Sequence, residues 1–133
     1  MLHLDTSVVV EFLRGNATIK RSVEAHKHDV AISTPVLAEL YFGARRSHRV
    51  MERTQQIQRL MMELRLVSFD AIAAEAYGRI RNLLRERRCS IGEMDTLIGA
   101  VAFAHRATLV TRNRNHFEQV EGLQIEDWLD VKT

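Results

Sequence analysis

The sequence has few of the residues that cross-link or interrupt a chain. Its 133 residues include one cysteine, one proline and six glycines, and aromatic side chains make up only 6%. Cys89 has no partner for an internal disulfide or for a thiolate metal site, so we interpret its thiol as incidental. No low-complexity tract, linker or repeat divides the chain, which predicts a single domain over residues 1–133.

Long hydrophobic runs are also missing. No apolar stretch approaches the length of a membrane span, and the one at the N-terminus is short, lacks a basic lead and is broken by Asp5 and Glu11. A composition that is 46% hydrophobic and 27% charged is typical of a globular domain with its own core. We therefore expect a cytoplasmic protein that does not bind membranes.

Lysine is scarce, whereas arginine is abundant. The chain has 3 lysines and 16 arginines, although its net charge is only +2. The planar guanidinium group is well suited to binding phosphate oxygens, so the bias favours a nucleic-acid partner. Genomic base composition can produce the same bias, and this alternative stays open at this point.

The spacing of apolar residues predicts an α/β fold. Short β-type runs cover residues 2–5, 30–33, 66–68 and 108–111, with a weaker run at 123–125. Apolar residues at helical spacing predict amphipathic helices over 50–64 and 72–83, the second capped by Asp70, and another helix should begin at Pro35 with Thr34 as its N-cap. Strands that alternate with helices in this way indicate a mostly parallel sheet with helices on both faces.

Three acids lie in segments that otherwise look like core. Asp5 ends the first apolar run, Glu39 interrupts the helix that begins at Pro35, and Asp95 precedes a long small-apolar stretch. An unpaired buried carboxylate costs several kcal/mol, roughly the stability of a whole domain. Ligands of open α/β sheets bind beyond the carboxyl ends of the strands, where at least two of these acids should lie.

A shared divalent cation would resolve the mutual repulsion of such acids. Oxygen ligands favour Mg²⁺ or Mn²⁺, and these ions also bind substrate phosphates and lower the pKa of an attacking water. Hydrolysis of phosphodiester bonds is therefore the natural chemistry. No Cys/His spacing typical of zinc competes with this interpretation.

Other interpretations weaken some of these assignments. Asp5 could simply cap the first helix, and Glu93 fits a capping box with Ser90, so Glu93 is left out of the acidic set. A phosphatase or a phosphoacceptor signalling domain is disfavoured, because Asp5 lacks the Asp-x-Asp pair of the former and the acidic pair of the latter.

Four ordered motifs resemble those of PIN-domain ribonucleases. They are Leu4-Asp5-Thr6-Ser7, Leu37-Ala38-Glu39-Leu40 with Gly43-Ala44, Gly92-Glu93-Met94-Asp95-Thr96-Leu97-Ile98, and Leu109-Val110-Thr111-Arg112-Asn113 with His116-Phe117. The final stretch, residues 122–128, further resembles the C-terminal signature of VapC toxins from bacterial toxin–antitoxin pairs. The resemblance extends over the whole chain.

This resemblance implies a three-layer α/β/α sandwich with the activity of a toxin. It implies a Mg²⁺-dependent endoribonuclease, with Mn²⁺ as a possible substitute, that leaves a 5′-phosphate and a 3′-hydroxyl. Asp5, Glu39 and Asp95 would be catalytic, and Asp5 and Asp95 would hold the metal. The implied partners are RNA, a small VapB-like antitoxin and an identical subunit. A PIN-like RNA-binding module with weak or no catalysis is the alternative.

Auxiliary roles fall to residues around the acids. By resemblance, Thr6 and Asn113 are supporting polar groups, and His116 takes a position where the family often has a fourth acid. Imidazole is a poorer magnesium ligand than carboxylate, which predicts one firmly bound ion rather than two. Arg112 and Arg114 share a loop with Asn113 and are our candidates for phosphate contacts, whereas a solvated surface is the default for the helical ridges Arg45/Arg49/Arg53 and Arg81/Arg85/Arg88.

Overall fold

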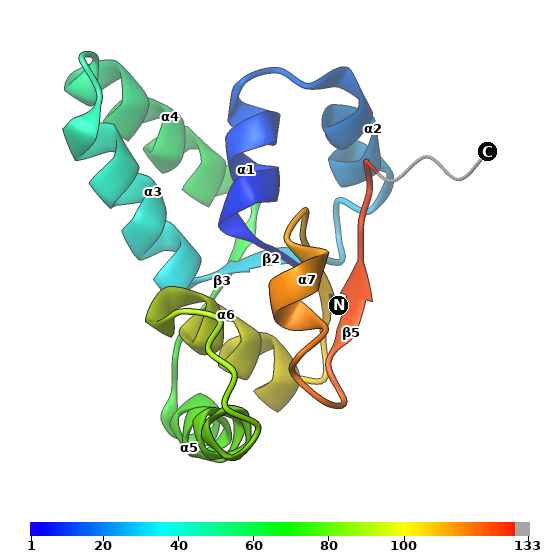
Figure 1. Ribbon diagram of the computed structural model, residues 1–133. Helices are drawn as coiled ribbons and strands as arrows, with labels where there is room; N and C mark the ends of the chain where they lie inside the picture. The colour runs from blue at the N-terminus through cyan, green and yellow to red at the C-terminus, as the bar shows by residue number, and fades with distance from the viewer. Residues whose placement is uncertain (130–133) are drawn as a thin grey trace.

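A computed structural model describes residues 1–129 of the chain. This part forms five strands and seven helices, which are arranged in space as in Figure 1. The strands are β1 (Leu2–Leu4), β2 (Val30–Ser33), β3 (Arg65–Val67), β4 (Thr108–Val110) and β5 (Gln124–Glu126). The helices are α1 (Thr6–Leu13), α2 (Ala17–Ala25), α3 (Thr34–Arg46), α4 (Val50–Glu63), α5 (Ala71–Glu86), α6 (Glu93–Ala104) and α7 (Arg114–Phe117).

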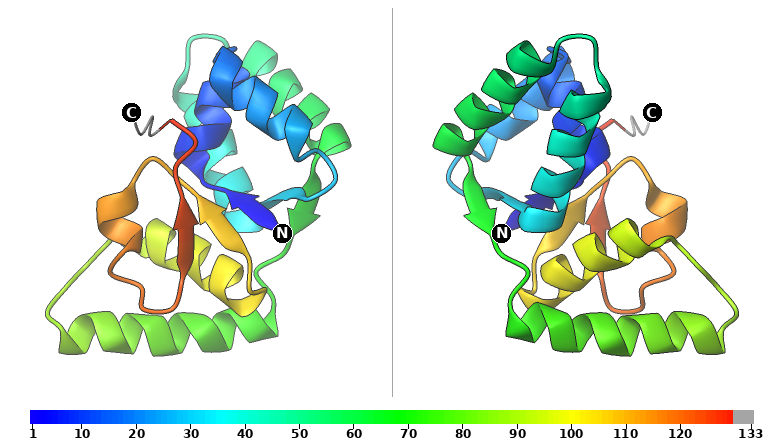
Figure 2. Two further views of the ribbon diagram at one scale, coloured as in Figure 1. Left: turned by 90° about the vertical axis from the view of Figure 1, so that its right-hand side faces the viewer. Right: turned by 90° about the vertical axis from the view of Figure 1, so that its left-hand side faces the viewer.

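The strands form one sheet in the order β3-β2-β1-β4-β5, and all four neighbouring pairs are parallel. Helices α1 to α4 cover one face and α5 and α6 the other, as the two views in Figure 2 show. The predicted α/β/α sandwich is therefore confirmed. Its larger core lies between the sheet and α1 to α4, and a smaller cluster around Ala76, Ile80 and Leu84 lies under α5 and α6.

This topology places a ligand crevice next to β1. The chain runs from β1 outward to β3 on one side and returns to fill β4 and β5 on the other. The carboxyl ends of β1 and β4 therefore flank the point where the strand order reverses, which is where open parallel sheets bind ligands. Among residues 1–129, no helix combines the length and the apolar character needed to cross a membrane.

Most predicted elements are confirmed with small shifts at their ends. The strand predicted at 66–68 lies at Arg65–Val67, and the weaker run at 123–125 forms β5 one residue later. The helix predicted over 72–83 is α5, and Asp70 caps it by accepting a hydrogen bond from the Ala73 amide at 2.9 Å. Of the apolar residues whose spacing predicts this helix, Ala76 and Ile80 are buried, whereas Ile72 and Leu83 are exposed.

Two predicted helix caps are wrong. Ser33, not Thr34, is the N-cap of α3, because the Thr34 hydroxyl instead accepts a hydrogen bond from the Phe69 amide at 3.0 Å. Ser90 and Glu93 form no capping box, since α6 begins at Glu93 itself. Its N-cap is Gly92, whose φ of +89° lies in the left-handed region that favours glycine.

Candidate active site

Asp5 is the most buried of the predicted acids, with 4% of its surface exposed. It follows β1 directly and is the N-cap of α1, where its Oδ1 accepts a hydrogen bond from the Thr6 amide at 2.8 Å. The Asp5 amide donates to the Val110 carbonyl at 2.8 Å, which ties the end of β1 to the end of β4. The capping interpretation of Asp5 is thus correct, and capping leaves its other oxygen facing β4.

That second oxygen is held by hydroxyl groups. Thr111 Oγ1 donates to Asp5 Oδ2 at 2.7 Å, and Ser7 Oγ donates to the same atom at 3.3 Å. Thr111 is fully buried and follows β4. Its Oγ1 also accepts a hydrogen bond from the Asn113 amide at 2.9 Å, so one hydroxyl links Asp5 to the loop after β4.

Glu39 approaches Asp5 from a different element. It lies in the second turn of α3, and its Oε1 accepts a hydrogen bond from Thr6 Oγ1 at 2.5 Å. Thr6 therefore contacts two acids, through its backbone amide to Asp5 and through its hydroxyl to Glu39. The second carboxylate oxygen of Glu39 makes no hydrogen bond with any residue in the described part of the chain.

Asp95 lies in the first turn of α6, with 21% of its side chain exposed. His116 Nδ1 lies 2.8 Å from Asp95 Oδ2, and Asn113 Nδ2 donates to this oxygen at 3.2 Å. His116 belongs to the short helix α7, and the fully buried Phe117 beside it anchors this helix against Gly99 of α6.

The protonation state of His116 decides its hydrogen bond. Its Nδ1 lies 2.8 Å from Asn113 Nδ2 as well as 2.8 Å from the Asp95 carboxylate. A proton on Nδ1 is donated to Asp95, whereas a bare Nδ1 accepts from the Asn113 amide. The Asn113 amide therefore donates to Asp95 in either case, whereas His116 donates to Asp95 only when its Nδ1 carries the proton.

These contacts form one hydrogen-bonded chain across the site. It runs from Glu39 through Thr6 to Asp5, and from there through Thr111 and Asn113 to Asp95. Burial raises the pKa of Asp5 above its ordinary value, hydrogen bonds from Thr111 and the Thr6 amide oppose this rise, and the charge of Asp95 adds to it. A nearby cation would favour the charged form of Asp5.

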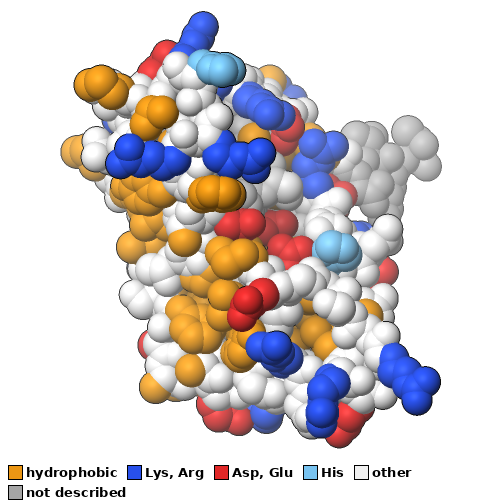
Figure 3. All heavy atoms as spheres, turned by 60° about the vertical axis from the view of Figure 1, so that its left-hand side comes forward, with side chains coloured by type: hydrophobic (Ala, Val, Ile, Leu, Met, Phe, Trp, Pro, Cys, Tyr) orange, Lys and Arg blue, Asp and Glu red, His pale blue; other side chains and the backbone are white. Residues whose placement is uncertain are grey.

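Figure 3 shows acidic side chains gathered in a hollow on the face formed by α3, α6 and α7, with hydrophobic and basic side chains on the rim. A cavity of about 300 Å³ opens beside Glu39, between α1, α3 and α4. Its remaining walls include apolar side chains such as Val10 and Leu13, together with Arg14 and Arg53.

The predicted phosphate contacts are engaged with acids. Arg112 NH1 lies 3.4 Å from Glu11 Oε1, and Arg114 NH1 lies 3.6 Å from Glu118 Oε1. Both arginines belong to the loop and helix that also carry Asn113. Their role in binding phosphate stays a prediction.

Hydrogen bonds connect Asp5, Glu39, Asp95, Thr6, Asn113 and His116 in the structure, and their roles in catalysis and metal binding stay predictions. Sequence reasoning missed Thr111 and Ser7, which hold Asp5 Oδ2. A hydroxyl residue directly after a buried strand was the available signal for Thr111. Ser7 lies two residues after Asp5, and this spacing alone does not show whether the serine hydroxyl binds the Asp5 carboxylate or faces solvent.

Comparisons with known proteins identify the family. A model of the PIN domain family matches residues 2–123. Ribonuclease VapC2 of Rickettsia felis is 34% identical over 104 residues, which are 78% of each chain. The tRNA(fMet)-specific endonuclease VapC of Shigella flexneri is 29% identical over 126 residues, which cover 94% of this chain and 96% of the relative.

Solved structures agree with this result. VapBC2 from Rickettsia felis, bound to a DNA fragment from its promoter, matches with a TM-score of 0.91 at 30% identity, over 96% of this chain and 99% of that one. DNA-bound VapBC from Salmonella typhimurium matches with a TM-score of 0.92 at 26% identity, over 96% and 97% of the two chains. The chain thus belongs to the PIN-domain family and, within it, to the VapC ribonucleases of toxin–antitoxin pairs.

Proposed function

We propose that this VapC protein is a Mg²⁺-dependent endoribonuclease that acts through Asp5, Glu39 and Asp95. The observation that carries the proposal is the hydrogen-bonded chain that holds these three acids together, although they come from the ends of separate elements. An arrangement that keeps Asp5 buried despite the nearby charge of Asp95 is costly without a cation. RNA as substrate agrees with the ribonuclease names of the relatives.

The donor set fits magnesium better than zinc. Among residues 1–129 there is no group of three or more His, Cys, Asp or Glu side chains placed to hold a metal ion, so a fully protein-bound ion is not supported. Magnesium is typically bound by one or two carboxylates, with waters and substrate phosphates completing its shell. Asp5 and Asp95 would supply the two carboxylates. When bound, the ion would lower the pKa of the attacking water, and Mn²⁺ would do the same.

The protein groups have separate tasks in this hydrolysis. Asp5 is fixed by Thr111, and Asn113 fixes Asp95, so both carboxylates are oriented before substrate arrives. Thr6 holds one oxygen of Glu39, and the other oxygen can accept the proton of the attacking water. Water oxygen bonds to phosphorus, the bond to O3′ breaks, and the departing O3′ takes a proton from solvent water, which yields a 5′-phosphate and a 3′-hydroxyl.

The protein would act as the toxin of a pair. Its structural relatives include toxin–antitoxin complexes, which supports a small VapB-like antitoxin as partner. An arginine from that partner could pair with the acidic cluster and occlude it, because a guanidinium forms bidentate bonds with carboxylates. We also propose an identical subunit as a partner of this chain.

Binding of RNA without efficient catalysis is the second candidate. The observation that favours it is the contact of His116 with Asp95, which places an imidazole where the family resemblance leads us to expect a fourth acid. A protonated imidazole there would neutralise part of the charge that a metal needs. Tight binding of Mg²⁺ and RNA without any turnover would distinguish this candidate from the nuclease.

Substitution of the acids tests the nuclease directly. Asp5→Asn and Asp95→Asn should each abolish Mg²⁺-dependent cleavage of total RNA and the growth arrest that expression of the toxin causes. Glu93→Gln is the matched control, because Glu93 is an exposed acid in the same helical turn as Asp95. Cleavage is measured by mapping new 5′ ends.

The Asn variants should remain folded, with an unchanged or higher thermal midpoint without metal, since the raised pKa of Asp5 marks a destabilising charge. Near wild-type cleavage by either variant would exclude the acidic cluster as the catalytic centre. A loss of cleavage in Glu93→Gln as well would show that the effect is not specific to the cluster.

A further inference from the structure

Beyond the acids, α3 carries an exposed aromatic side chain three residues after Glu39. Phe42 of α3 is 64% exposed, and the guanidinium carbon of Arg46 lies 5.6 Å from the centre of its ring. Among residues 1–129 Phe42 is the most exposed aromatic side chain, so its ring is accessible to a ligand from solution. One face of the ring is therefore covered by a cation, and no other aromatic ring among residues 1–129 stacks on Phe42.

Phe42 lies on the same helical face as the catalytic acid. Residues three, four and seven positions apart share one side of a helix, so Glu39, Phe42, Gly43 and Arg46 form one stripe along α3. Gly43 adds no side chain between them, and a Cβ placed there would meet no atom within 4 Å. Glu39 and Gly43 also line the cavity beside α1 and α4, and Phe42 lies between these two residues in the sequence, on the exposed side of the same turn.

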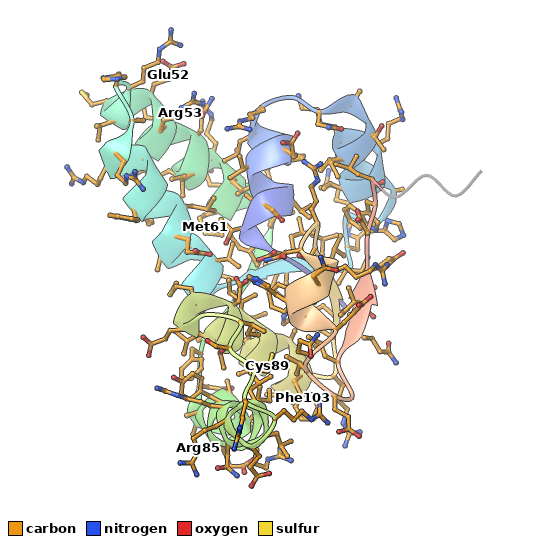
Figure 4. All side chains as sticks on the ribbon, in the orientation of Figure 1. Glu52, Arg53, Met61, Arg85, Cys89 and Phe103 are labelled. Carbon is orange, nitrogen blue, oxygen red and sulfur yellow. The ribbon has the colours of Figure 1, made fainter. Side chains whose placement is uncertain are left out.

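The charges around this stripe favour a polyanion. Among residues 1–129, Arg45 and Arg46 pair with no carboxylate, and Arg53 of α4 donates only to Gln56 at 3.3 Å. Arg53 also lines the cavity beside Glu39, and Figure 4 shows it at the end of the molecule formed by α3 and α4. These free guanidinium groups contrast with Arg112 and Arg114, which are paired with acids.

We infer that Phe42, supported by Arg46, is a stacking platform for an unpaired RNA base next to the cleaved phosphodiester bond. This inference rests on the proposed ribonuclease function. Proteins that bind single-stranded RNA combine basic side chains along the phosphates with aromatic rings under the bases. Phe42 is then a substrate-positioning residue. The basic side chains around the ring favour an RNA strand over a second copy of the chain, because RNA is a polyanion.

The test measures RNA affinity and base stacking separately from cleavage. The probe is an unstructured single-stranded RNA oligonucleotide with one 2-aminopurine, titrated in EDTA so that it stays intact. Binding is followed by anisotropy of an end label, and stacking by quenching of the 2-aminopurine. Phe42→Ala should weaken binding roughly tenfold, the loss expected for one base–aromatic stack, and should abolish the quenching.

Cleavage kinetics and rescue separate stacking from simple packing. Phe42→Ala should raise KM by a similar factor with little change in kcat, because the substitution leaves the acids in place. Phe42→Trp should restore affinity and quenching, whereas Phe42→Leu should not. Equal binding by Phe42→Leu and wild type would overturn the inference, because an apolar contact without stacking would then be sufficient.

Two matched controls are available in the chain. Ile72 is 65% exposed, so Ile72→Ala removes a similarly exposed apolar side chain from α5. Arg79 has its guanidinium carbon 5.6 Å from the ring centre of Phe103, which belongs to the last turn of α6 and lies far from Arg53 in Figure 4. Arg46→Gln should weaken RNA binding and reduce its salt dependence, and Arg79→Gln should do neither.

The remaining outcomes are also decisive. If Phe42→Ala changes the sedimentation behaviour of the protein and its affinity loss follows that change, Phe42 is a subunit contact and the inference is wrong. If the wild type cleaves and binds RNA but Phe42→Ala behaves like Ile72→Ala, only the inference fails. A wild type that neither binds nor cleaves RNA would overturn the proposed function and this inference with it.

Discussion

A buried histidine should make this protein lose stability in mild acid. His3, in the middle of β1, is only 2% exposed, and neither of its ring nitrogens has a hydrogen-bond partner among the described residues. Burial, together with the nearby charges of His105 and the amino terminus, lowers the pKa of His3 from 6.5 to about 4. The imidazole is therefore neutral in the folded protein at neutral pH.

The sign and size of the effect follow from proton linkage. Because the pKa of His3 is lower in the folded state, the unfolded chain binds the proton first as the pH falls from 6.5 towards 4, and stability decreases over this window. The free energy of unfolding should decrease by about 3 kcal/mol in total, and about 2 kcal/mol of this decrease should be reached at pH 5. Such a loss is a large part of the stability of an ordinary domain.

Urea denaturation of wild type and His3→Leu between pH 7.5 and pH 5 measures this effect. Circular dichroism is the suitable signal, because the fluorescence of Trp128 also depends on its stacking with His26. His3→Leu should lose about 2 kcal/mol less than wild type over this range, since leucine cannot take up a proton. His28→Leu, which replaces an exposed histidine, is the control. The same pH dependence in wild type and His3→Leu would refute the reasoning.

Two further predictions concern the site. Thr111→Val should keep the fold but reduce the rate of RNA cleavage by roughly ten- to a hundredfold, because Asp5 Oδ2 loses its hydrogen bond of 2.7 Å and the Asn113 amide loses its hydrogen bond of 2.9 Å. Cleavage rates measure the loss, and the far-ultraviolet spectrum checks the fold. Full activity would show that Thr111 has only a structural role. His116→Asp should add a second Mn²⁺ site in the absence of RNA, which calorimetric titration detects; identical stoichiometry, affinity and preference for Mg²⁺ or Mn²⁺ would place His116 outside the metal shell.

Much of the fold could be predicted because its signals are local. The buried strand β2 and the helix α4 each follow from a short run of apolar residues at the right period. The caps at Ser33 and Gly92 were missed because the alternatives, Thr34 and Ser90, are equally good capping residues by type. Thr34 instead contacts Phe69, which is distant in sequence, and only tertiary structure reveals such a competing partner.

The site, like the fold, contains some features that the sequence reveals and others that only the tertiary structure reveals. Asp5, Glu39 and Asp95 were recognisable because a carboxylate in an apolar segment is unusual by itself. The sequence did not reveal the role of Thr111 or the ion pairs of Arg112 and Arg114. These contacts depend on which distant residues the connections between strands bring together. Phe42 illustrates the same limit, since its sequence neighbours Tyr41 and Leu40 give no sign that its ring is left open.

The fold itself reduces the cost of collecting these acids. Asp5 caps α1 and Asp95 lies in the first turn of α6, so both carboxylates lie at helix N-termini, where the partial positive charge of the helix favours an anion. Glu39 lies in the second turn of α3, beyond most of that effect, and depends on the Thr6 hydroxyl instead. Two helix N-termini thus add to the hydrogen bonds from Thr6, Ser7, Thr111 and Asn113 that hold the cluster together. Burial, with the Asp95 charge adding to it, still raises the pKa of Asp5, so these contacts offset the cost of the buried charge only partly, and we expect a bound cation to stabilise the cluster further.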